Sequence, residues 1–154
     1  MPLRAMNEEA YIHALTCNYL RTNYPDVIFT SDLSGIRLPM ALAKKVKPLK
    51  SSRGIPDLII FYPTGGYHGL LIELKAPEAK ILKRDGTLRR NDHLEEQLQV
   101  IHQLRALGYA AFFCRGFAAA RGCIEFYMRL ASPLGGDALR STCREGNHPI
   151  EWCG

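Results

Sequence analysis

GIPDLIIFYPTGGYHGLLIELKAP, residues 54–77, is predicted to form a hairpin of two apolar strands around a glycine-containing turn. The strands are DLIIFY and GLLIELKA, and the turn is PTGGYH. Core strands normally carry hydrophobic side chains, yet Asp57, Glu73 and Lys75 stand in these two strands. These three polar residues therefore need either a functional role or a specific partner.

Strand alternation predicts how the polar residues meet. Along the second strand it separates two faces, which are Leu70, Ile72 and Leu74 on one side and Leu71, Glu73 and Lys75 on the other. If the hairpin is centred on Gly65, Asp57 falls opposite Glu73. Directly opposed side chains have Cβ atoms about 5 Å apart. The sequence therefore predicts a pair of neighbouring carboxylates with a lysine beside them.

Two carboxylates this close repel each other unless a cation lies between them. Oxygen ligands that leave positions open for water and phosphate suit Mg²⁺ or Mn²⁺. Lys75 is no metal ligand, but it can hold a nucleophilic water or offset charge that develops on a phosphate. The alternative is an ordinary surface ion pair between Glu73 and Lys75, with Asp57 capping the turn after Pro56. Acid-plus-ExK patterns alone are too short to decide between these readings.

A further carboxylate is predicted from the N-terminal helix, residues 7–22, which begins with Asn7 as N-cap. Its apolar residues recur at helical spacing: Tyr11, Ile12, Leu15, Tyr19 and Leu20. Glu8 lies within about 40° of Ile12, Leu15 and Tyr19 around the helix axis. We therefore expect Glu8 to face inward, with Glu9 as the alternative.

The remaining pattern predicts an α/β fold with a mixed sheet of about four strands flanked by helices. The expected elements are a strand over 26–33, the hairpin, a helix over 93–109, a strand over 110–116 and a helix over 117–131. The helix over 93–109 has an expected apolar stripe of Leu94, Leu98, Ile101, Leu104 and Leu107. We expect one domain over 1–131 and an irregular tail over 132–154, in the same domain or as a dimer arm.

Composition indicates a soluble, cytoplasmic protein. Five cysteines form an odd set without a Cys-x-x-Cys pair, which favours reduced thiols. Cys143, His148 and Cys153 in the tail fit no standard metal site. The N-terminus has no signal core, and no apolar run approaches the roughly 20 residues that cross a bilayer. We expect no membrane association.

Positive charge is concentrated in two segments of this protein, whose formal net charge is +5. Residues 35–53 contain six basic residues and no acid, and residues 78–93 form a basic loop. Taken alone, such a run is more often a solvated surface than a binding site. For residues 35–53, the position directly before Asp57 favours binding to a polyanion.

The ordered set RGIPDLIIF, GLLIELKAP and EEQLQVIHQLRALGYAAFFCRG resembles the VRR-NUC family of the PD-(D/E)xK nuclease superfamily. Pro56-Asp57 is similar to the PD element, and Glu73-Leu74-Lys75 is similar to the ExK element. The resemblance runs from about Glu8 to Tyr127. The chain departs from the family pattern at residues 34–37 and in a longer loop after the second strand.

The resemblance implies a restriction-endonuclease-like core that hydrolyses DNA with Mg²⁺ or Mn²⁺. It implies metal binding by Asp57, Glu73 and the Leu74 carbonyl, and by Glu8 directly or through water, with Glu9 as fallback. Lys75 would be the catalytic lysine and Gln97 would order the site. The candidate DNA contacts are Arg37, Lys44, Lys45, Lys47, Lys50, Arg53, Lys83, Arg84, Arg89 and Arg90.

Members that consist of this domain alone occur in phages and bacteria and resemble Holliday-junction resolvases, which act as homodimers. The expectation is therefore a homodimer that cuts branched DNA in the cytoplasm of a bacterial or phage-infected cell. A flap or linear-duplex nuclease would share every catalytic residue. The alternative of another class is a noncatalytic DNA-binding module, whose sequence would lack one of the acids or the lysine.

Overall fold

The computed structural model describes residues 8–32, 39–81, 83–85, 87, 89 and 91–130. The helices are α1 (Glu8–Asn23), α2 (Met40–Val46), the 3-10 helix η2 (Lys47–Leu49), α3 (Asp92–Ala106) and α4 (Gly116–Met128). The strands are β1 (Ile28–Ser31), β2 (Leu58–Phe61), β3 (Leu70–Lys75) and β4 (Ala110–Arg115). The predicted tail over 132–154, with Cys143, His148 and Cys153, lies outside the described residues.

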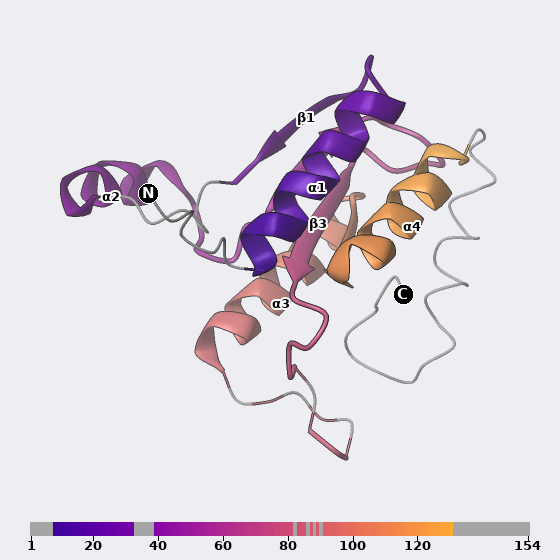
Figure 1. Cartoon of the computed structure of the whole chain (residues 1–154). Helices are drawn as coiled ribbons and strands as arrows, with labels where there is room; N and C mark the ends of the chain where they lie inside the picture. Colours follow the sequence, from indigo (N-terminus) through magenta and orange to yellow (C-terminus); the bar gives the residue numbers. More distant parts are fainter. Residues whose placement is uncertain are drawn as a thin grey trace, which may run out of the picture.

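The four strands form one mixed sheet in the order β1-β2-β3-β4. β1 pairs with β2, and β2 with β3, in antiparallel directions, whereas β3 and β4 are parallel. The parallel pair requires a crossover, and α3 provides it between β3 and β4 (Figure 1). The expected α/β fold with a mixed four-stranded sheet is confirmed.

The hairpin of β2 and β3 has the register predicted from a turn centred on Gly65. Leu58 pairs with Ile72, and Ile60 pairs with Leu70. At the tip, however, Thr64 pairs with Tyr67, so the tight turn is centred between Gly65 and Gly66. Both glycines have positive φ, 58° and 82°, which suits a two-residue hairpin turn. The one-residue offset between tip and strands is taken up by an extra residue on the β2 side.

Strand alternation distributes β3 between two hydrophobic layers, as predicted. Leu70, Ile72 and Leu74 are buried in the cluster formed with α1 and α4, whereas Leu71 belongs to the cluster on the side of α3. Figure 1 shows α1 and α4 together on one face of the sheet. Because both faces are covered, five of the six residues of β3 are buried.

The buried face of α1 differs from the predicted apolar stripe. The helix buries Ile12, Thr16, Cys17 and Leu20, whereas Tyr11 is 55% exposed. The Thr16 hydroxyl donates a hydrogen bond of 2.8 Å to the Ile12 carbonyl, so a polar residue is satisfied inside the core. Of the predicted stripe, Ile12 and Leu20 are buried and Tyr19 packs against the core, but the centre of the buried face is shifted toward Thr16 and Cys17.

In α3 the predicted stripe is correct near the start and wrong at the end. Leu94 and Ile101 are buried, but Gln97 is buried with them and Leu107 is 66% exposed. The helix ends at Ala106, and Gly108 with a φ of 87° turns the chain toward β4. Leu107 therefore lies just beyond the helix, and its side chain does not reach the core.

Cys17 and Cys114 are buried thiols, which agrees with the expected reduced state. Within the described part of the chain, none of the helices combines the length and apolar character needed to cross a bilayer.

Candidate active site

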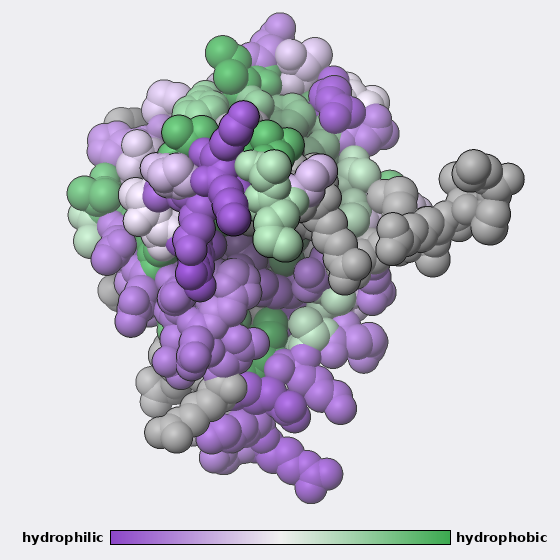
Figure 2. All heavy atoms as spheres, turned by 90° about the vertical axis from the view of Figure 1, so that its left-hand side faces the viewer, coloured by the Kyte–Doolittle hydropathy of each residue, from purple (hydrophilic) through white to green (hydrophobic). Residues whose placement is uncertain are grey.

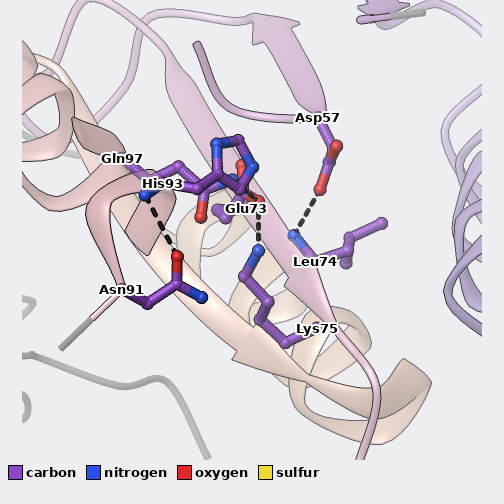
Figure 3. Close-up of polar contacts among 7 residues, drawn as sticks. All are labelled: Asp57, Glu73, Leu74, Lys75, Asn91, His93 and Gln97. Atoms are coloured by element: carbon purple, nitrogen blue, oxygen red, sulfur yellow. Dashed lines mark hydrogen bonds and ion pairs between the residues drawn. The ribbon is translucent and has the colours of Figure 1, made fainter. Parts of the chain in front are cut away.

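Asp57, Glu73 and Lys75 converge at the carboxyl end of β3, because the β2–β3 register sets them side by side. Asp57 directly precedes β2, one position beyond the Leu58–Ile72 pair, and continuing that register places it opposite Glu73. The backbone N–H of Leu74 donates to Asp57 Oδ2 at 2.8 Å (Figure 3). This bond fixes the Asp57 carboxylate against β3.

The Glu73 carboxylate is buried and held from two directions. Its side chain lies on the same face of β3 as Lys75, whose Nζ is 2.8 Å from Glu73 Oε1. The Gln97 amide of α3 donates to the same oxygen (Figure 3). Glu73 Oε2 and Gln97 Oε1 are both buried and have no hydrogen-bond partner among the described residues. Buried acceptors of this kind usually indicate a missing donor or cation.

Burial and mutual repulsion raise the pKa values of both acids. Burial is the main cause for Glu73, followed by the negative charge of Asp57, and together they raise the pKa of Glu73 to about 8 even though Lys75 opposes them. Burial likewise raises the pKa of Asp57, while the bond from Leu74 opposes the rise. Carboxyls with raised pKa values in a cluster are typical of functional sites.

Helix α1 contributes Glu9 to the electrostatics of this cluster. The negative charge of Glu9 raises the pKa of both Asp57 and Glu73. At about 100° per residue, Glu9 falls near the centre of the buried face of α1 and Glu8 about a quarter turn away. Both side chains are exposed. The corrected phase of the helix therefore favours Glu9 over Glu8 as the acid that faces the site.

His13 is a neighbour of the site that sequence reasoning missed. Its Nε2 lies 2.9 Å from Ser31 Oγ, and Ser31 Oγ also contacts the Cys17 sulfur at 3.3 Å. The hydrogen bond with Cys17 is the main cause that raises the pKa of His13, and the charges of Asp57 and Glu73 raise it further. The only sequence signal was its position one helical turn after Glu9.

Gly54 sets the approach of the chain to α3 before Asp57. A Cβ atom at Gly54 would lie 2.6 Å from the Glu96 carbonyl oxygen and 2.9 Å from Gln97 Cα. The two backbones therefore touch where only glycine fits. This contact brings the residues before Asp57 against the helix that carries Gln97.

The candidate DNA-binding residues fall into three groups. The exposed ones are Lys44, Lys45, Lys47, Arg53, Lys83, Arg84 and Arg89. Lys50 is only partly exposed and forms an ion pair with Asp32 at the end of β1. Asp32 in turn donates its backbone N–H to the Asp57 carbonyl at 2.7 Å. Arg37 and Arg90 lie outside the described residues.

The donor set fits a hard divalent cation. Asp57, Glu73 and the Leu74 carbonyl offer oxygen ligands only, and Glu73 Oε2 is buried without a partner. No group of three or more His, Cys, Asp or Glu side chains converges as a metal cage within the described residues. A site with two carboxylates suits Mg²⁺ or Mn²⁺, which retain several waters, better than Zn²⁺.

Comparison with known proteins identifies the family. Residues 32–118, more than half of the chain, match the family model of the VRR-NUC domain. The chain belongs to the VRR-NUC domain family. It is therefore a nuclease domain of the PD-(D/E)xK type, which implies DNA as substrate and use of a divalent metal ion. The match covers the hairpin and α3 and leaves out α1 with Glu8 and Glu9.

A solved structure supports the fold. It is named a VRR_NUC domain protein, has 24% sequence identity and a TM-score of 0.55, and the alignment covers 84% of this chain and 94% of that chain. No curated protein matches the sequence.

Proposed function

We propose that this VRR-NUC domain is a metal-dependent DNA endonuclease whose active site is formed by Asp57, Glu73, Lys75 and Gln97. The observation that carries the proposal is the buried Glu73 carboxylate, which receives Lys75 and Gln97 on one oxygen and leaves Oε2 unpartnered beside Asp57. An ordinary surface ion pair would be exposed, whereas Glu73 is 2% exposed.

Asp57, Glu73 and the Leu74 carbonyl are the proposed ligands of Mg²⁺ or Mn²⁺, with a helix acid acting directly or through water. The phase of α1 supports Glu9 in that role over Glu8. A bound divalent cation would polarise the scissile phosphate and lower the pKa of a water.

The chain's own residues supply the rest of the mechanism. The Leu74 N–H and the Gln97 amide orient the two carboxylates. In the described conformation the Lys75 ammonium donates to Glu73, and a small rotation of its long side chain would let it hold a nucleophilic water or offset charge on the phosphate. The lysines and arginines around the site would bind DNA phosphates without reading base sequence.

For the substrate, we propose branched DNA cut by a homodimer, as in a Holliday-junction resolvase. One domain with one site reaches one strand at a time, so two symmetric cuts at a four-way junction require two copies. A flap or linear-duplex nuclease would use the same residues. The noncatalytic alternative is disfavoured because both acids, the lysine and the glutamine are in place. A cytoplasmic location stays a prediction.

A labelled DNA panel tests this proposal. Four-way junction, flap, single-stranded and linear duplex DNA are incubated with the full chain in Mg²⁺, Mn²⁺ or EDTA. Paired symmetric nicks in the junction, absent in EDTA, are the expected result, with a dimeric mass in solution. Cleavage of flap or linear DNA alone would replace the resolvase proposal, and cleavage in EDTA would contradict the metal-dependent site.

A further inference from the structure

The α2–η2 arm, residues 40–49, projects from the body of the protein (Figure 1). Neither α2 nor η2 buries any residue. Its apolar side chains are nevertheless large: Met40 is 76% exposed, Leu42 45% and Leu49 80%. A surface helix normally turns such residues toward a core, so an exposed set of this kind indicates a contact made with a partner.

The charge of the arm selects a polyanion as that partner. Lys44, Lys45 and Lys47 are exposed beside these apolar residues, and the sequence from Pro39 to Pro56 contains no acid. Figure 2, which views the side from which α2 projects, shows hydrophilic and hydrophobic atoms intermixed on this face. Lysines at this density bind DNA phosphates through counterion release.

The arm is anchored beside the proposed active site. Directly after η2, Lys50 forms an ion pair with Asp32, whose backbone N–H is bonded to the Asp57 carbonyl. From this anchor η2 and α2 together extend at most about 16 Å, or roughly five base steps of a DNA strand. DNA held by the arm therefore lies within a few nucleotides of Asp57.

The apolar residues restrict which DNA suits the arm. Phosphates offer Met40 and Leu49 no apolar surface, and an intact duplex hides its base faces inside the stack, so that mainly sugar C–H groups and thymine methyl groups remain exposed. Apolar side chains of DNA-binding proteins gain contact where bases are unstacked, by wedging between steps or lying against an exposed base. A gap, a fork and a junction all expose such faces.

We propose that the α2–η2 arm recognises DNA at an interruption of the base stack. Met40 and Leu49 lie against exposed bases, and Lys44, Lys45 and Lys47 hold the flanking phosphates. The inference rests on the proposed nuclease function and adds a determinant of substrate shape. The arm gives the enzyme a preference for interrupted DNA. The acid cluster of Asp57 and Glu73 cannot supply this preference, because it acts on a phosphate that every DNA shape presents.

The test measures binding in EDTA, so it does not depend on cleavage. Two duplexes share one sequence, and one has a short gap with 2-aminopurine at its edge. The full chain is compared with Met40→Ser/Leu49→Ser and with Lys44→Gln/Lys45→Gln/Lys47→Gln. The matched control is Leu107→Ser, which removes an exposed leucine (66%) at the end of α3.

The apolar double variant is expected to reduce the preference for gapped over intact duplex about tenfold, or about 1.4 kcal/mol. It should also abolish the change in 2-aminopurine fluorescence that binding of the wild type is expected to cause. The lysine variant should weaken binding to both duplexes alike. It should also reduce the slope of log K against log salt concentration by roughly two to three units. Leu107→Ser should behave as wild type.

The inference would be overturned if the apolar variant lost affinity equally for the gapped and the intact duplex, or lost affinity for neither. A change in oligomeric state with unchanged DNA preference would make the arm a protein contact and would also overturn it. A wild type that binds neither duplex overturns it as well. If the variant loses gap preference while no DNA is cut in Mg²⁺ or Mn²⁺, the nuclease proposal fails and the arm's role stands.

Discussion

Gln97 and Glu73 lie 24 positions apart in the sequence, and the Gln97 amide on α3 donates a hydrogen bond to the Glu73 carboxylate on β3. Both side chains are nearly completely buried. Gln97→Ala would leave Glu73 Oε1 with Lys75 alone and would free the carboxylate to rotate. We expect a 10–100-fold loss of kcat/KM, about the cost of removing a residue that orients a metal ligand.

The control for Gln97 is Gln103→Ala, an exposed glutamine of the same helix. Circular dichroism and thermal unfolding should show that both variants fold. Equal activities of the two variants would show that the Gln97 hydrogen bond has no part in catalysis.

The raised pKa of Glu73 predicts how stability depends on pH without divalent cations. A carboxyl with a pKa near 8 in the folded protein keeps its proton where the unfolded chain, with a value of 4.5, has lost it. The folded state then binds more protons, so the stability contributed by this group is complete below the unfolded value and is lost as pH rises through the folded value. Urea unfolding in EDTA should show the wild type losing stability between pH 5 and 8 relative to Glu73→Gln.

Parallel pH profiles of the wild type and Glu73→Gln would contradict the buried, protonated state of Glu73. Glu78→Gln is the matched control, because Glu78 is exposed and follows β3 by three positions. It should leave the wild-type pH profile unchanged.

Metal binding should compete with the proton on Glu73. Because a ligand carboxyl must lose its proton, Mg²⁺ or Mn²⁺ should raise the melting temperature more at pH 8 than at pH 6. Asp57→Asn should abolish this increase, since it removes one of the two carboxylates. A shift that is independent of pH, or that persists in Asp57→Asn, would place the cation elsewhere.

Gly54→Ala tests the close contact between the chain before Asp57 and α3. The added methyl group meets the backbone at 2.6 Å, which the Glu96 carbonyl cannot avoid by a side-chain rotation. We expect a loss of about 1–3 kcal/mol in the free energy of unfolding, the usual cost of overpacking, together with reduced cleavage. Chemical denaturation and the junction assay measure both effects.

Gly122→Ala is the control for Gly54, because nothing lies within 4 Å of a Cβ atom there and the residue is inside α4. In the middle of a helix this change should stabilise by about 0.5–1 kcal/mol. If Gly54→Ala were as stable and active as Gly122→Ala, the close contact would have no role in forming the site.

The hairpin was predictable from sequence because strand side chains alternate with a period of two. That period put Glu73 and Lys75 on one face, and the register of Leu58 with Ile72 followed from the position of the glycine turn. The turn's own offset did not matter, because an extra residue on the β2 side restores the register. Local periodicity therefore predicted the relative positions of Asp57, Glu73 and Lys75.

The features that depend on tertiary packing were not predictable in this way. Thr16 and Cys17 are buried in α1 through a backbone hydrogen bond and helix packing, which shifts the inward face toward Glu9. The ion pair of Lys50 with Asp32 joins segments 18 positions apart. His13 reaches Ser31 only because α1 lies across the end of β1. None of these contacts leaves a periodic pattern in the sequence.

The most direct test of the proposed active site is cleavage of labelled four-way junction DNA by Asp57→Asn, measured in Mg²⁺ beside Asp26→Asn. Asp57 lies beside Glu73, whereas Asp26 is an exposed aspartate before β1 at the far end of the sheet. Asp57→Asn should bind the DNA with near wild-type affinity and make no detectable cut, while Asp26→Asn should cut as the wild type does. Wild-type cleavage by folded Asp57→Asn would show that Asp57 has no part in the active site.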